Sequence, residues 1–138
     1  MKVKVIEGGR APARKTAGSA GLDCCARVAT RIMPYHAELV PLGFACEIPE
    51  GHVGILTLRS SVGLRGTLLV PHGVGIIDSD YRGEVCAIVQ AGENAVSIPE
   101  GERLAQMVIV PFVAVDVEVV DELGATVRGE GGFGSTGG

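Results

Sequence analysis

Short apolar runs that end in turn signals restrict this chain to a fold built from strands. The runs cover 2–6, 22–30, 37–48, 52–58, 66–71, 84–91, 102–112 and 113–120. Many alternate apolar and polar residues, and turns such as the two PEG sequences separate them. No window of twelve or more residues keeps a helical period, and only 60–66 has room for a turn of helix. The pattern predicts an all-β sandwich or barrel with at most one short helix.

The chain length and the glycine distribution predict one packed domain followed by an arm. A chain of 138 residues is expected to form one domain. The composition changes after Gly124, and we expect the packed domain to cover 1–124. Residues 125–138 are rich in glycine, which loses more backbone entropy on ordering than any other residue. This segment is expected to be a flexible C-terminal arm.

Charge and hydropathy exclude two classes of partner. The net charge of −4 argues against bulk nucleic-acid binding, which needs a basic surface. No apolar run is long enough for a membrane helix, and the N-terminal residues lack the features of a signal peptide. We therefore expect a cytoplasmic protein without nucleic-acid or membrane partners. Its four cysteines form no CxxC pair and are expected to be buried, reduced thiols.

The stretch GIIDSDYRGE, 75–84, combines an apolar strand end with polar chemistry. Asp78 and Asp80 are equally typical of an ordinary turn, because Asp hydrogen-bonds to its own backbone. Asp78 nevertheless follows apolar residues, and Tyr81 and Arg82 place a ring and a cation nearby. A carboxylate in this setting is a candidate general base that takes a proton from water.

Two further stretches have the composition of an anion site. In LRSSVGLRG, 58–66, Arg59 precedes two serines and two glycines, which offer a guanidinium, hydroxyls and backbone amides; a solvated polar loop is the alternative. The arm, with Arg128, Phe133, Ser135 and Thr136, has groups to wrap a phosphate chain and to cover a flat ring. A tail without function is its alternative.

Two polar residues lie inside apolar strands. Gln106 interrupts the run 101–110 and needs a hydrogen-bond partner, either structural or a ligand. Asp23 lies among small residues in 19–26, where a structural carboxylate is equally reasonable.

Together these stretches resemble the five ordered motifs of trimeric dUTP diphosphatases. The matching segments are AGLDCCA, RSSVG, GIIDSDYRG, GERLAQMVIVP and RGEGGFGSTG, between 20 and 137. The resemblance implies a jelly-roll-like β fold and a homotrimer whose active sites are shared between subunits. It also implies Mg²⁺-dependent hydrolysis of dUTP to dUMP and pyrophosphate, which limits uracil in DNA and supplies dUMP for dTMP synthesis.

The resemblance also implies a role for each matching residue. Asp78 activates the water that attacks the α-phosphorus, and Tyr81 packs against the deoxyribose. The uracil is read by the backbone around Gly75 and by His72, and Phe133 stacks on it. The phosphate chain is bound by Arg59, Ser60, Ser61 and Gln106, and by Arg128, Gly134, Ser135 and Thr136 of an arm that reaches a neighbouring subunit. Mg²⁺ binds mainly to the phosphates, with Asp23 acting through a water.

Three features depart from the family pattern. Ser61 replaces a glycine of the second motif, and Cys24–Cys25 replaces a leucine and a frequent aromatic residue in the first. His72 stands where many bacterial members have an asparagine, and its side chain either contacts the base or faces solvent.

Two alternatives remain open from the sequence. The related dCTP deaminases share the RSS-like second motif, but they typically carry a Trp in the third motif and a Glu as proton carrier, and this chain has no Trp. A non-catalytic nucleotide sensor on the same scaffold would not need the combination of Asp78, Arg59 and Phe133.

Overall fold

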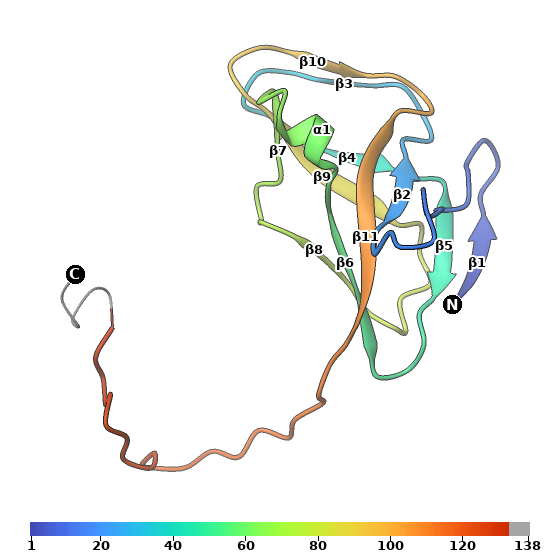
Figure 1. The fold of residues 1–138 in the computed structure, drawn as a ribbon. Coiled ribbons are helices and arrows are strands. Elements are labelled where there is room, and N and C mark those ends of the chain that lie inside the picture. The colour runs from blue at the N-terminus through green and yellow to red at the C-terminus, as the bar shows by residue number, and fades with distance from the viewer. Residues whose placement is uncertain (133–138) are drawn as a thin grey trace.

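The structure is a computed structural model that describes residues 1–132, and it is almost entirely β-sheet (Figure 1). The strands are β1 (Lys2–Val5), β2 (Leu22–Cys25), β3 (Thr30–Ile32), β4 (Ala37–Pro41), β5 (Phe44–Glu47), β6 (His52–Leu58), β7 (Leu68–Leu69), β8 (Gly75–Ile77), β9 (Cys86–Ala91), β10 (Val96–Ile98) and β11 (Arg103–Pro111). The single helix of the described residues is α1 (Ser60–Gly63). This confirms the predicted all-β class with one short helix.

Two main sheets carry the architecture. One has the strand order β2-β11-β6-β8 and the other has the order β4-β9-β7. Two antiparallel pairs, β1 with β5 and β10 with β3, complete the jelly-roll-like fold. β11 is the longest strand and is paired on both sides, so that Gln106 lies opposite Thr57 of β6 and Asp23 of β2.

The hydrophobic core draws residues from both main sheets, as the alternating pattern predicts. On β9, Ala87, Val89 and Ala91 are buried, whereas the residues between them are more exposed. The largest fully buried side chains are Phe44, Ile32, Leu42, Ile98, Leu104 and Met107. On β9, alternation therefore places one face of the strand in the core and leaves the other for the surface or the site.

The run at 113–120 is the clearest departure from the predicted strands, because it forms no strand in this chain. Strand pairing ends at Pro111, and Phe112 donates its backbone N–H to the carbonyl of Gly51 at 3.0 Å. Beyond that point the chain leaves the barrel as an extended segment (Figure 1). The boundary at 124 remains a prediction, but the last barrel strand ends well before it.

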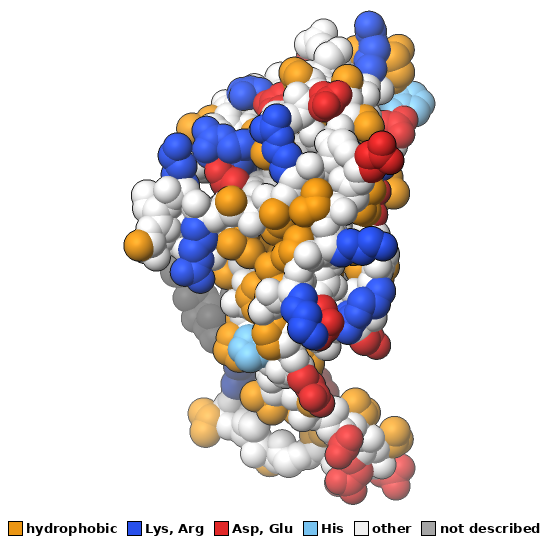
Figure 2. Space-filling model, turned by 90° about the vertical axis from the view of Figure 1, so that its right-hand side faces the viewer, with side chains coloured by type: hydrophobic (Ala, Val, Ile, Leu, Met, Phe, Trp, Pro, Cys, Tyr) orange, Lys and Arg blue, Asp and Glu red, His pale blue; other side chains and the backbone are white. Residues whose placement is uncertain are grey.

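No helix in the described part of the chain is both long and apolar enough to cross a membrane. On the face shown in Figure 2, Lys and Arg side chains are interspersed with Asp and Glu and border a band of hydrophobic side chains. This face therefore carries no continuous basic surface.

Candidate functional site

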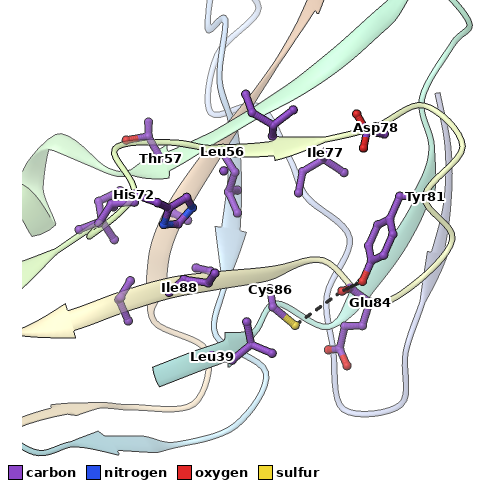
Figure 3. A pocket seen from close by; sticks show the side chains of 17 residues that line it. Leu39, Leu56, Thr57, His72, Ile77, Asp78, Tyr81, Glu84, Cys86 and Ile88 are labelled. Carbon is purple, nitrogen blue, oxygen red and sulfur yellow. Dashed lines mark hydrogen bonds between the residues drawn. The ribbon is translucent and has the colours of Figure 1, made fainter. Parts of the chain in front are cut away.

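An apolar cavity of about 400 Å³ lies between the β6–β8 pair and the β4–β9 sheet. Its wall contains four of the predicted site residues: His72, Gly75, Asp78 and Tyr81. In Figure 3, His72 lies at one end of the cavity and Tyr81 at the other, with Leu56 and Ile77 between them. The mostly apolar lining with a few polar groups is typical of a small-molecule site.

β8 delivers Asp78 to this cavity. The strand pairs with β6 so that Gly75 lies opposite Leu56, and Asp78 follows its last residue, Ile77. A Cβ at Gly75 would come within 3.2 Å of the Leu56 Cβ, so the glycine permits this close approach. Because β8 is the edge strand of its sheet, the backbone groups on its outer edge are available to a ligand.

The turn after Asp78 is closed by its own residues. The backbone N–H of Tyr81 donates to the carbonyl of Asp78 at 3.2 Å. Arg82 folds back and donates to the carbonyls of Ser79 at 2.7 Å and of Tyr81 at 3.0 Å. Arg82 therefore stabilises the turn, and the side chain of Tyr81 lines the cavity next to Asp78.

His72 belongs to the loop between β7 and β8. The residue is exposed, yet its side chain contributes to the cavity wall (Figure 3). The structure thus gives His72 access both to solvent and to a ligand in the cavity.

A second polar cluster joins β2, α1 and β11. The Arg59 Nε donates to Asp23 Oδ1 at 2.9 Å, and the Arg103 Nη1 donates to Asp23 Oδ2 at 3.1 Å. A further Arg59 nitrogen lies 3.5 Å from the Ser61 hydroxyl, and Ser60 begins α1. The cluster thus concentrates two guanidinium groups and two hydroxyls, a combination suited to an anion.

Gln106 is half-buried beside this cluster and has a structural partner. Its Nε2 donates to the carbonyl of Leu58 at 3.3 Å. A Cβ at Gly21 would come within 2.7 Å of the Gln106 Oε1, so the glycine leaves space for this amide. The bond holds Gln106 next to Arg59, the residue that follows Leu58.

Arg103 is a member of the cluster that the sequence predictions missed. The signal was present, since Arg103 lies within GERLAQ, three residues before Gln106. What the sequence could not show was that its guanidinium shares the carboxylate of Asp23 with Arg59.

The residues of the arginine cluster do not line the cavity of their own chain, although Leu58 and Ala105, which precede Arg59 and Gln106, do. None of Asp23, Arg59, Ser60, Ser61 and Gln106 lines the cavity that contains Asp78 and Tyr81. Arg128 lies on the extended segment, where its Nε donates to the carbonyl of Gly131 at 2.8 Å. The predicted residues Phe133, Gly134, Ser135 and Thr136 lie outside the described residues.

The four cysteines are free thiols, as predicted, with Cys24 and Cys46 buried and Cys25 and Cys86 half-buried. Burial raises the pKa of Cys24 to about 12. Burial also raises the pKa of Cys86, which lines the cavity. Within residues 1–132, no three His, Cys, Asp or Glu side chains gather closely enough to form a metal site.

Comparison with known proteins agrees with the fold and the motifs. The family model for dUTPase matches residues 8–137. The deoxyuridine 5'-triphosphate nucleotidohydrolases of Anaeromyxobacter sp. strain Fw109-5 and Methylocella silvestris are each 43% identical to this chain, over 91% of it and over 86% and 82% of their own lengths.

Solved structures give the same answer. The dUTPase of Staphylococcus bacteriophage 80alpha with dUPNHPP superposes with a TM-score of 0.89 at 28% identity, covering 99% of this chain and 97% of that one. The dUTPase of phage phi11 of S. aureus gives a TM-score of 0.81 at 25% identity, covering 91% and 98%. The chain therefore belongs to the dUTPase family of enzymes.

Proposed function

We propose that this protein hydrolyses dUTP to dUMP and pyrophosphate, with Asp78 activating the water that attacks the α-phosphorus. The observation that carries the proposal is the cavity at the edge strand β8, which sets His72, Gly75, Asp78 and Tyr81 around one apolar space. A base and a sugar fit an apolar pocket, while a carboxylate at its rim can accept the proton of a water molecule.

Uracil is read mainly by the backbone of β8. Its unpaired outer edge presents fixed N–H and C=O groups near Gly75. A base with the wrong donor pattern would leave such groups without partners, which is costly in a dry site. His72 contributes a ring nitrogen at the end of the cavity opposite Tyr81 (Figure 3).

The phosphate chain binds at the arginine cluster. Arg59, Ser60, Ser61 and Gln106 bind the phosphates directly, while Asp23 holds Arg59 in place through its carboxylate. Ser61 adds a hydroxyl where the family pattern has glycine, and in this structure it lies beside Arg59.

The residues present fit a magnesium ion that arrives with the nucleotide. Mg²⁺ usually keeps waters and binds one or two carboxylates together with substrate phosphates, and no three-ligand protein site exists among the described residues. Asp23 contacts the ion through a water in this proposal, even though both of its oxygens already accept bonds from arginines. The bound ion would neutralise phosphate charge and orient the triphosphate.

The complete site is shared between subunits of a homotrimer, and the arm of one subunit closes over the site of another. Two observations support this. The residues of the arginine cluster do not line the cavity of their own chain, and the extended segment exposes Val113, Val115, Val117 and Val119 without a strand partner in the described chain. Residues 125–138 reach about 45–50 Å when extended, so Arg128 and the residues after it can cross to a neighbour.

In this proposal the arm orders on the polyphosphate, and charge-assisted hydrogen bonds offset the entropy that its glycines lose. Turnover would limit uracil in DNA and supply dUMP for dTMP synthesis. The cytoplasmic location expected from the sequence stays a prediction.

Incubation with dUTP, dCTP and dTTP, with pyrophosphate and ammonia assayed separately, tests the reaction. We expect pyrophosphate from dUTP alone and no ammonia. Ammonia from dCTP would favour the deaminase alternative, and binding without either product would favour a nucleotide sensor.

A further inference from the structure

Tyr81 rests on a support formed by the two residues that follow Arg82. Its hydroxyl donates to the backbone carbonyl of Glu84 at 3.1 Å. Its ring lies so close to Gly83 that a Cβ at that position would clash with the phenol. The ring therefore has a defined place at the cavity although 45% of the residue is exposed.

The side chain of Glu84 accepts three hydrogen bonds, two from Arg27 and one from Gly43. Its Oε1 accepts from the Arg27 Nε at 2.8 Å and from the Gly43 N–H at 2.9 Å, and its Oε2 accepts from the Arg27 Nη2 at 3.1 Å. The hydrogen bonds from Arg27, with a smaller one from Gly43, hold the pKa of Glu84 below its usual value. Paired N–H donors from one guanidinium fix a carboxylate in direction as well as in distance.

The donors on Glu84 lie in connections that are bound to neighbouring strands. Arg27 follows β2 and donates its backbone N–H to the carbonyl of Pro41, the last residue of β4, at 2.8 Å. Gly43 has a φ of +77° and packs against Gly9, where a Cβ would clash with its backbone. On the strand side, the N–H of Val85 donates to the carbonyl of Phe44 at 2.8 Å. The side chain of Glu84 is thus fixed by Arg27 and Gly43. Its backbone is fixed through Val85, which is bonded to Phe44 of β5.

We propose that Arg27 and Glu84 are positioning residues that fix Tyr81 and thereby set the discrimination between deoxyribose and ribose. The inference rests on the proposed function, in which Tyr81 packs against the deoxyribose. Because UTP differs from dUTP by a single hydroxyl, a wall that excludes it must stay in place to within about 0.5 Å. A ring that was free to change rotamer would give way to the extra oxygen.

The test compares kcat/KM for dUTP and UTP in Glu84→Ala, Arg27→Ala and the conservative Arg27→Lys. We expect the dUTP/UTP ratio to fall about tenfold in both alanine variants, as for loss of charge-assisted hydrogen bonds. In Arg27→Lys, which keeps the charge, we expect a dUTP/UTP ratio between those of the wild type and Arg27→Ala. The control Glu47→Ala removes the exposed 3.0 Å Lys2–Glu47 pair and leaves the ratio unchanged.

If Glu84 acts through Tyr81, its substitution should have no effect on the ratio once the Tyr81 ring is removed. Tyr81→Ala lowers the ratio by itself, and Glu84→Ala adds no further loss in that background. An equal additional loss there would overturn the inference, as would a ratio unchanged to within about twofold in Glu84→Ala.

Tyrosine fluorescence separates failure of this inference from failure of the proposed function. The chain has two tyrosines and no Trp, so Tyr81 is the sole source of tyrosine fluorescence in Tyr35→Phe. We expect acrylamide to quench it more strongly once Glu84→Ala is added, whether or not dUTP is hydrolysed. Unchanged quenching would overturn the inference that Glu84 fixes the ring of Tyr81. Absence of dUTP hydrolysis by the wild type would instead overturn the proposed function.

Discussion

Two consecutive segments of this chain have similar alternating valines and different structures. β11 is paired with β2 on one side and β6 on the other, and Leu104, Ala105 and Met107 are buried. The next segment, 113–120, continues the alternation, yet its valines are exposed, up to 94% at Val119. Alternation determines which face of a strand is apolar, but a strand also needs an unpaired backbone edge beside it. β11 has two such neighbours, and the segment 113–120 has none among the residues that the structure describes.

The largest predicted effect concerns magnesium. Chelation with EDTA is expected to abolish dUTP turnover, and the melting temperature is expected to stay the same because no protein metal site exists among the described residues. Calorimetry and a pyrophosphate assay on the same sample check both parts. A collapse of the melting temperature would instead indicate a structural metal.

The next effect isolates the chemistry of the barrel from that of the arm. Asp78→Asn is expected to lower kcat by about 10²–10⁴-fold, the usual contribution of a general base. Nucleotide binding and oligomeric state should persist, as measured by calorimetric titration and light scattering. Activity within about threefold of the wild type would rule out Asp78 as the base.

Truncation after Val127 isolates the arm. We expect a large loss of activity with little change in the melting temperature, since Arg128 makes its side-chain bond to the arm itself. Mixed trimers of this variant and Asp78→Asn should regain activity if arms are exchanged, because some sites then combine an intact Asp78 with an intact arm. Once mass spectrometry shows that mixed trimers have formed, an inactive mixture would rule out the shared site.

Substitutions in the core and in the segment 113–120 should affect different properties, the stability of the fold and the association of subunits. Leu104→Ala, at a fully buried residue, is expected to cost about 2–5 kcal/mol of unfolding free energy. Val117→Ser, at a residue 87% exposed in the chain, is expected to weaken association between subunits. Denaturant titration at several protein concentrations separates these two effects. A loss of stability in Val117→Ser that does not depend on protein concentration would contradict docking of the segment 113–120 on a neighbouring subunit.

The smallest effect concerns acid. Because Arg27 lowers the pKa of Glu84 from its usual 4.5, the pair adds stability above that pH and loses it as the pH falls further. We therefore expect the wild type and Glu84→Gln to differ in stability at neutral pH and to converge as the pH falls below 4.5 and through the lowered pKa of Glu84. Thermal melts across this range measure the difference, and parallel curves would show that the pair contributes nothing.

Much of the site was predictable because its residues are contiguous in sequence. The stretch 75–84 carries Gly75, Asp78 and Tyr81 within one strand and turn, and the structure brings them to one cavity. Arg103, Arg27 and Glu84 were missed for the opposite reason. Arg103 lies 80 residues from Asp23 in sequence, and Arg27 lies 57 residues from its partner Glu84. No local sequence pattern predicts such pairs.

The sequence by itself determined the strand-rich class, the buried face of alternating strands such as β9 and the five motifs of the dUTPase family. These depend on local alternation, on turn residues and on short segments that keep their own geometry. Only the tertiary structure decided that Asp23 lies between two arginines, that Glu84 supports Tyr81 and that the valines of 113–120 have no strand partner among the described residues. Each of these depends on which strands become neighbours, and strand order is set by the packing of the whole core.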